Sequence, residues 1–417
     1  MMQKEVVVVG GGIVGLFCAY YLRQEGHRVI VLDKGDMNSG ASYVNAGYLI
    51  PSHIVPLAAP GMVTKGLKWM FNSSSPFYIQ PRLNLDLIDW GLKFMRSCTK
   101  QHVQRSLGVI KDINVLSKEL YADLNSTPAF DFHLEERGVL MAFQTTAAEK
   151  EEAEVMREAQ ALGLDVSLID RAEVQALQPE VEMDIAGAYH YRCDAHSTPS
   201  TVLEQLKQQL EGSGVELHKN TAVQSLKTQG AKVTAVVTNK GEFLADEVVI
   251  ASGAWTQQLL KAVGIHLPIQ AGKGYSLNEE KPTGISMPAI LMEAKVAVTP
   301  MQGFTRFSGT MEIAGVNHKI RKNRVNAIAA AAEAVYGGLK ISDSTKAEVQ
   351  CGLRPLSPDG LPFVGKTNKY ANLSLASGHS MMGWSLGPVT GKLIAELLSE
   401  KKTSLDLSPF SPDRTYG

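Results

Sequence analysis

The chain has 417 residues, with 41 basic and 42 acidic side chains, and 44% of it is apolar. A charge this close to neutral argues against a nucleic-acid-binding surface, which needs excess positive charge to neutralise phosphates. The four cysteines form no CxxC pair and no zinc-ligand cluster, so we expect no metal site and a reducing, cytoplasmic compartment. No secretory signal is visible, and no apolar run reaches the ~20 residues of a membrane span.

The first thirty-five residues predict a strand, a glycine-rich turn, a helix and a second strand. The turn has the spacing G-x-G-x-x-G at Gly10, Gly12 and Gly15, after a β-branched strand over 5–9 and before a helix over 13–24. In a dinucleotide site such glycines allow a tight turn, close approach of the backbone to a pyrophosphate, and close helix–strand packing. The helix N-terminus then offers backbone N–H groups and its dipole to the phosphates.

Asp33 ends the second strand, over 28–32, and follows Gly12 by 21 positions (33 − 12 = 21). A carboxylate there can accept hydrogen bonds from the ribose hydroxyls of an adenosine, and it disfavours the 2′-phosphate of NADP. The motif leaves FAD and NAD open. A glycine-rich turn that binds no ligand is the structural alternative.

The rest of the chain alternates helices and strands without a long repeat or a low-complexity linker. Residues 51–81 are irregular and 266–310 are strand-rich. A second αβ stretch at 198–262 suggests that one parallel sheet is assembled from distant segments. Helices are predicted over 85–98, 103–124, 147–162, 199–210 (with Thr198 as N-cap), 323–335 and 389–398; strands over 138–144, 215–217, 222–226, 232–237 and from 246 to the small-residue turn 252–255. We therefore expect an α/β fold of two interleaved domains.

Four further segments, together with the N-terminal unit, resemble the FAD-dependent D-amino acid oxidase superfamily, and within it the bacterial D-amino acid dehydrogenase branch of small-subunit type. They are Asn45–Gly47 with Pro51, Ala251–Trp255, Cys351–Pro362 and Gly378–Lys392. Residues 59–61, 68–71 and 273–277 also resemble that branch.

The resemblance implies a Rossmann-like FAD-binding domain over 1–60, 197–262 and 346–417. It is interleaved with a substrate domain over 61–196 and 263–345, built on a mixed β-sheet with helices. FAD is expected to be non-covalent, because Cys351 reads as a small buried residue. The residues assigned to the cofactor are Gly10, Gly12, Ile13, Val14, Gly15, Asp33, Lys34, Ser42, Asn45, Ala46, Gly47, Leu49, Val223, Ser252, Gly253, Trp255, Arg354, Gly378, His379, Met381, Met382, Gly383 and Trp384.

The implied reaction is oxidation of an amino acid, with a D-amino acid, D-proline and D-hydroxyproline as the substrates considered. Hydride would pass from Cα to flavin N5, and the electrons would go on to a quinone or another respiratory acceptor. Arg354 is the candidate clamp for the substrate carboxylate, since its guanidinium matches a carboxylate bidentately; a turn arginine bonding local carbonyls is the alternative. His379, Tyr275 and Tyr48 are further catalytic candidates, with packing in the core as the alternative for each.

Lys65 and Lys68, with residues 69–71, form a basic aromatic segment suited to peripheral contact with the inner face of the plasma membrane. Burial in the core is the alternative. Three other functions compete with the dehydrogenase: a glycine or sarcosine-type oxidase using oxygen, an NAD-dependent Rossmann enzyme, and a flavoprotein subunit acting mainly in electron relay. The sequence leaves the oligomeric state open.

Overall fold

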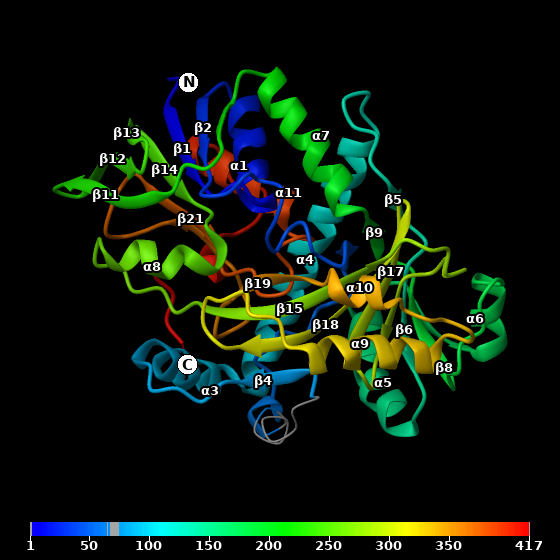
Figure 1. The fold of residues 1–417 in the computed structure, drawn as a ribbon. Coiled ribbons are helices and arrows are strands. Elements are labelled where there is room, and N and C mark those ends of the chain that lie inside the picture. Colours follow the sequence, from blue (N-terminus) through cyan, green and yellow to red (C-terminus); the bar gives the residue numbers. More distant parts are fainter. Residues whose placement is uncertain (1, 65, 67–74, 417) are drawn as a thin grey trace.

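The computed structural model describes residues 2–64, 66 and 75–416, and Figure 1 shows their arrangement. The basic aromatic segment at Lys65, Lys68 and 69–71 lies outside the described residues. In the part of the chain that is described, no helix combines the length and apolar character needed to cross a membrane.

A six-stranded sheet is assembled from segments far apart in the sequence. Its order is β10 (Glu216–His218), β2 (Arg28–Leu32), β1 (Glu5–Val9), β14 (Glu247–Ile250), β21 (Leu373–Ser377) and β20 (Phe363–Lys366). The first five strands run parallel and β20 is antiparallel to β21. The valine run of β1 is buried because both faces of the sheet are covered.

Helices cover one face of this sheet, and a small sheet with a short helix covers the other. The first face packs against α1 (Ile13–Gln24), α4 (Lys100–Asn125), α7 (Pro199–Gly212) and α11 (Gly387–Leu398). The second packs against β11 (Val223–Gln229), β12 (Lys232–Thr238), β13 (Gly241–Leu244) and α8 (Thr256–Lys261). A Cβ on Gly391 would overlap the backbone of Phe17, so α1 and α11 meet backbone to backbone.

A larger mixed sheet forms the second layer. Its order is β19 (Gln350–Leu356), β15 (Gln270–Glu279), β18 (Phe304–Ile313), β17 (Val296–Met301), β16 (Ala289–Leu291), β6 (Val139–Phe143), β8 (Gly187–Tyr191) and β7 (Val166–Asp170), and β4 (Phe77–Ile79) pairs with β18. Around it lie α3 (Leu85–Ser97), α5 (Thr146–Ala161), α6 (Arg171–Leu177), α9 (Lys322–Val335) and α10 (Asp343–Ala347). A separate three-stranded sheet consists of β3 (Tyr48–Leu49), β9 (Ala195–Ser197) and β5 (Leu134–Glu135).

The predicted α/β class and the mixed second sheet are confirmed, and every predicted helix is present; α1 has the predicted bounds, and the others differ at one or both ends. The helix predicted from 103 begins at Lys100, because the Thr99 side chain accepts a hydrogen bond from the His102 N–H. Thr198 holds the N-cap position of α7, but its hydroxyl accepts no hydrogen bond from the first turn of that helix. It accepts one from the Gln302 N–H. The irregular stretch 51–81 contains β4. Strand β19 belongs to the second sheet although it falls in segment 346–417, and the domain boundaries stay a prediction.

Candidate active site

A cavity of about 940 Å³ lies where the parallel strands end and the second sheet begins. Val9, Leu32, Ala251 and Ser377, at the carboxyl ends of β1, β2, β14 and β21, all line it. Ligands of doubly wound sheets bind at this edge, outside the carboxyl ends of the strands. The opposite wall comes from β15, β16, β17, β18 and β19 of the second sheet.

Most of the residues singled out from the sequence line this cavity. They are Gly10, Gly12, Ile13, Val14, Asp33, Lys34, Ser42, Asn45, Ala46, Tyr48, Val223, Ser252, Gly253, Trp255, Tyr275, Arg354, His379, Met381, Met382, Gly383 and Trp384. Gly15, Gly47, Leu49 and Gly378 do not line it. They lie behind the wall: a Cβ on any of the three glycines would overlap a neighbour, and Leu49 is fully buried.

The turn between β1 and α1 presents bare backbone to the cavity. Gly10 has φ +116°, and a Cβ there would overlap the carbonyl oxygen of Ala251. The Asp33 carboxylate accepts the N–H groups of Gly11 and Gly35, each at 2.7 Å, and each oxygen keeps a second lone pair. The first N–H of α1, on Ile13, donates to Ser42 Oγ at 3.0 Å, so it is not free as the sequence led us to expect.

Lys34, Trp255 and His318 form a stack at the Asp33 end of the cavity. Lys34 Nζ lies 3.2 Å from the centroid of the Trp255 ring, and burial lowers the pKa of this lysine. The His318 ring stacks on the Trp255 ring, with centroids 6.1 Å apart. His318 lines the cavity, but no sequence pattern pointed to it.

Arg354 lies on β19, and its guanidinium lies over Gly274 of the neighbouring strand β15. A Cβ on Gly274 would overlap that guanidinium. Arg354 Nη1 donates to the carbonyl oxygen of Thr310 at 2.9 Å, its one hydrogen bond found within the described residues. Burial lowers the pKa of Arg354 to about 10, so the side chain stays charged at neutral pH. The remaining N–H groups are left for a ligand in the cavity.

Thr310 has a backbone conformation that is rare for a β-branched residue. Its φ is +71°, and it lies where the register between β15 and β18 shifts next to Lys273 and Tyr275. The shift turns the Thr310 carbonyl toward Arg354. A left-handed residue of this kind is strained and tends to occur at functional sites.

The three other predicted catalytic side chains have polar atoms that are paired within the protein. The Tyr275 hydroxyl donates to Glu312 Oε2 at 3.1 Å, and the Tyr48 hydroxyl lies 2.9 Å from the carbonyl oxygens of Ala289 and Val298. His379 Nε2 pairs with Thr390 Oγ1 of α11 at 2.9 Å. Buried polar groups need partners, and these partners belong to the protein. The three residues line the cavity with these polar atoms paired within the protein, and their catalytic roles stay predictions.

The family model of FAD-dependent oxidoreductases matches residues 5–397. The chain belongs to this family.

A D-amino acid dehydrogenase of Granulibacter bethesdensis is 30% identical over 420 residues, which cover 99% of this chain and 100% of that relative. One of Methylobacterium radiotolerans is 32% identical, over 95% of this chain and 96% of the relative. The crystal structure of glycine oxidase from Geobacillus kaustophilus has a TM-score of 0.77 at 23% identity and covers 100% of both chains. The resemblance seen in the sequence is confirmed, and so is FAD as the cofactor.

The cavity of this FAD-dependent oxidoreductase suits its cofactor. Bare backbone at Gly10 and Gly12, the acceptor oxygens of Asp33 and the small-residue turn at Ser252 and Gly253 give one end the character of a dinucleotide site. Its volume lies near the upper end of the ~300–1,000 Å³ range of ligand pockets. NAD chemistry is no longer needed to explain the glycine motif.

Sequence reasoning missed several residues on the second-sheet side. Ile290, Ala297 and Ser308 are direct neighbours across β16, β17 and β18, and all three line the cavity. His53 lines it too, and burial lowers the pKa of its imidazole. The alignment of Ile290, Ala297 and Ser308 across three strands depends on the strand register, which no local pattern in the sequence specifies.

His379 makes the stability of the protein depend on pH. Burial lowers its pKa from 6.5 to about 3, so the native ring stays neutral where the unfolded ring takes up a proton. The unfolded state then binds more protons, and stability falls as the pH drops from about 6.5 toward 3, by up to ~1.4 kcal/mol per pH unit. We expect the free energy of unfolding, measured with urea at several pH values, to change less with pH in His379→Gln than in the wild type. An equal change with pH in the two proteins would contradict this prediction.

Proposed function

We propose that this FAD-dependent oxidoreductase is a dehydrogenase that oxidises a D-amino acid at Cα to an imino acid, which water hydrolyses to a keto acid and ammonia. D-proline or D-hydroxyproline would give a cyclic imine instead. FAD, when bound, supplies the two-electron acceptor for the hydride from Cα. The electrons then pass to a quinone. The observation that carries the proposal is Arg354, a half-buried cation with N–H groups available to a ligand in the cavity.

Arg354 would bind the substrate carboxylate through paired N–H groups. The fork geometry matches a carboxylate, and a charge-assisted pair is stronger than a neutral hydrogen bond. Because Thr310 and Gly274 hold the guanidinium in place, little reorganisation is needed on binding. Ile290 and Ala297, both uncharged, would then face the substrate side chain.

The cofactor would be held along the cavity by the residues that line it. Gly10 and Gly12 would face its phosphates, and Asp33 would accept from its ribose hydroxyls. The loop between β21 and α11, with His379 to Trp384, would contact the flavin. Cys351 lines the cavity with its pKa raised by burial, so its thiol is a poor nucleophile, which favours non-covalent FAD. Release of all flavin on denaturation tests this point.

The D-configuration rests on the relatives, which are named D-amino acid dehydrogenases at 30–32% identity. The similarity to the glycine oxidase structure supports one alternative, a glycine or sarcosine-type oxidase that reduces oxygen. A subunit acting mainly in electron relay is the other. Arg354 favours an enzyme with its own carboxylate substrate over a relay subunit.

Anaerobic bleaching of the flavin against D- and L-amino acids, prolines and glycine derivatives tests the proposal. We expect bleaching by D-amino acids, followed by reoxidation with a quinone analogue and little hydrogen peroxide in air. Bleaching by glycine or sarcosine with stoichiometric peroxide would establish the oxidase. Absence of bleaching by every amino acid would refute the proposed activity.

Gly274→Ala is expected to raise KM for the amino acid substrate by about tenfold to a hundredfold, since overpacking by one methyl costs ~1–3 kcal/mol. The added methyl would displace the Arg354 guanidinium from its position over β15. FAD content and dithionite reduction of the flavin should match the wild type. An unchanged KM would show that the guanidinium does not need this glycine.

A further inference from the structure

Helix α3 is apolar on two faces, and one of them is uncovered. Its inner face, with Leu87, Trp90 and Phe94, packs against the end of the second sheet. The outer face carries Leu85, Ile88, Leu92 and Met95, spaced three, four and three residues apart, so that they form one stripe. Leu83 precedes the helix on the same stretch of chain. We call these five residues the α3 stripe.

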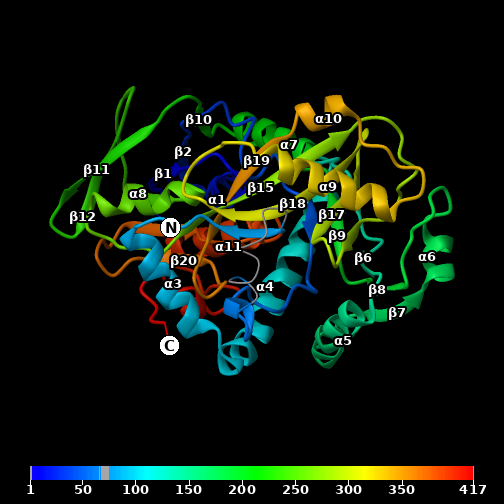
Figure 2. The same ribbon diagram turned by 60° about the horizontal axis from the view of Figure 1, so that its bottom comes forward.

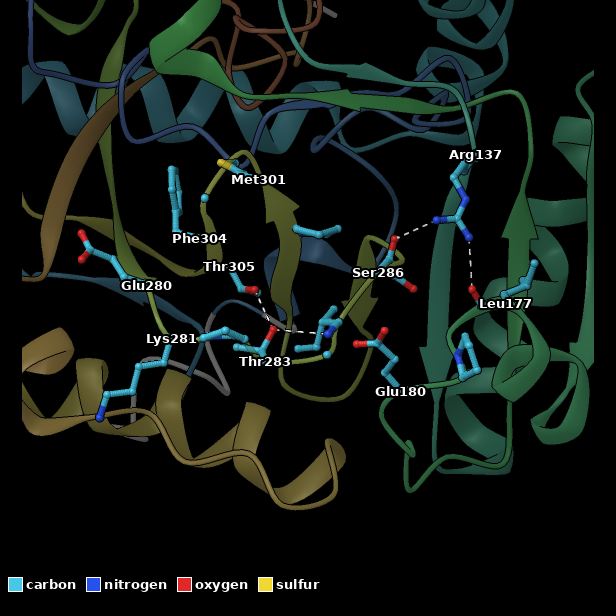
Figure 3. A pocket seen from close by; sticks show the side chains of 16 residues that line it. Arg137, Leu177, Glu180, Glu280, Lys281, Thr283, Ser286, Met301, Phe304 and Thr305 are labelled. Carbon is cyan, nitrogen blue, oxygen red and sulfur yellow. Dashed lines mark hydrogen bonds between the residues drawn. The ribbon is translucent and has the colours of Figure 1, made fainter.

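The α3 stripe is unusual in its exposure. Leu83 is fully exposed, Leu85 is 84% exposed, and Ile88, Leu92 and Met95 are each about half exposed. Elsewhere in the described residues, exposed large apolar side chains are scattered one by one, as with Leu168 and Leu244. A contiguous apolar patch on a soluble surface marks an interaction site far more often than single side chains do. Figure 2 shows α3 lying on the outside of the molecule, near the C-terminus.

The charges around the α3 stripe favour a negatively charged partner. The two acids of α3 are paired within the chain: Asp86 with Lys261 at 2.6 Å, and Asp89 with Lys93 at 2.7 Å. Asp89 also forms a hydrogen bond with His266 Nε2 at 3.1 Å. Arg96 in the last turn of α3 is exposed, and so are Lys100 and Arg105 in the first turns of α4. Within the described chain none of these three has an ion pair. Exposed positive charge without an ion pair therefore follows the apolar stripe along the chain, at the end of α3 and the start of α4.

We propose that the α3 stripe docks this protein on an anionic lipid bilayer. Apolar side chains next to exposed Lys and Arg are the pattern by which a surface helix enters the headgroup region. A second copy of the chain fits less well, because it would bring Arg96, Lys100 and Arg105 to acids that are already paired. One helix face is also small compared with the ~800 Å² per partner of a standard protein interface.

Docking there would bring the substrate-binding strand close to the bilayer. The Trp90 indole N–H on the inner face of α3 donates to the carbonyl oxygen of Leu356 at 2.9 Å, two residues beyond Arg354 on β19. The α3 helix alone, roughly 10 Å thick, then separates this part of β19 from the lipid. A membrane-dissolved quinone is the acceptor named in the proposed function, but the docking surface is inferred independently of it.

Flotation with lipid vesicles tests the docking surface in the FAD-loaded protein. The wild type is expected to float with vesicles of phosphatidylglycerol and phosphatidylcholine. In Leu85→Ser/Ile88→Ser/Leu92→Ser the bound fraction should fall by about tenfold or more. The matched control Leu168→Ser/Leu244→Ser removes exposed apolar side chains from other surfaces and should bind like the wild type. Arg96→Gln/Lys100→Gln/Arg105→Gln should lose the preference for phosphatidylglycerol.

Failure of the wild type to float, or equal flotation of the α3 and control variants, would overturn the proposal. A wild-type dimer that dissociates in the α3 variant, without vesicle binding, would assign the stripe to a second copy instead. Because the stripe is exposed, melting temperatures should be unchanged; if the triple variant unfolds, Leu83→Ser gives the same test. Reduction of a soluble dye by the substrate reports on the proposed activity separately and should be equal in all variants.

Discussion

Replacement of Arg354 by alanine is expected to lower kcat/KM for the preferred amino acid by about 10²–10³-fold, with FAD still bound. Removing one partner of a buried, hydrogen-bonded charge pair costs ~2–5 kcal/mol, much of it because the other charge is left unpaired. Here the unpaired charge would be the substrate carboxylate. Stopped-flow flavin reduction over a range of substrate concentrations measures the effect.

Two further measurements separate carboxylate binding from a purely structural role for Arg354. Arg354→Lys retains a positive charge but lacks the forked pair of N–H groups, so its kcat/KM should lie between those of the wild type and Arg354→Ala. Flavin content and melting temperature should change little, because among the described residues the guanidinium makes one hydrogen bond to the protein, to Thr310. Full kcat/KM in Arg354→Ala would refute the clamp and favour a protein that acts in electron relay.

Gly15→Ala is expected to weaken FAD binding by about tenfold to a hundredfold, because forcing a methyl into a packed contact costs ~1–3 kcal/mol. Gly15 does not line the cavity, but a Cβ added at this position would overlap the carbonyl oxygen of Gly10. Helix α1 must then move away from β1, and the turn that presents Gly10 and Gly12 moves with it. Titration of the apoprotein with FAD, followed by flavin fluorescence, measures the change.

Gly108→Ala is the matched control for this prediction. Gly108 lies within α4, and a Cβ there meets nothing within 4 Å. Because the added methyl meets no neighbour, the control should bind FAD normally. It should also melt slightly higher, because alanine favours a helix over glycine by up to ~1 kcal/mol. Equal FAD affinity in Gly15→Ala and Gly108→Ala would show that close packing of α1 on β1 is not required for the cofactor site.

The sequence by itself determined the β1–α1–β2 unit, the position of most helices and strands, and the glycines and acid that line one end of the cavity, Gly10, Gly12 and Asp33. These features depend on short-range patterns: β-branched runs, helical spacing, and glycines where a Cβ has no room. The spacing of Gly10, Gly12 and Gly15 and the acid at Asp33 all act within one βαβ unit, so about thirty residues suffice to recognise it.

The substrate side was decided by tertiary structure. Arg354 was identified through resemblance, but its support from Gly274 and Thr310 depends on the pairing of β15 with both β18 and β19 and on a shift in register. The polar atoms of Tyr48, Tyr275 and His379 point to partners 11 to 250 residues away in the chain, which no local pattern reveals. Buried polar groups must be satisfied wherever the fold brings a partner, and that place follows from strand register and helix packing across the whole chain.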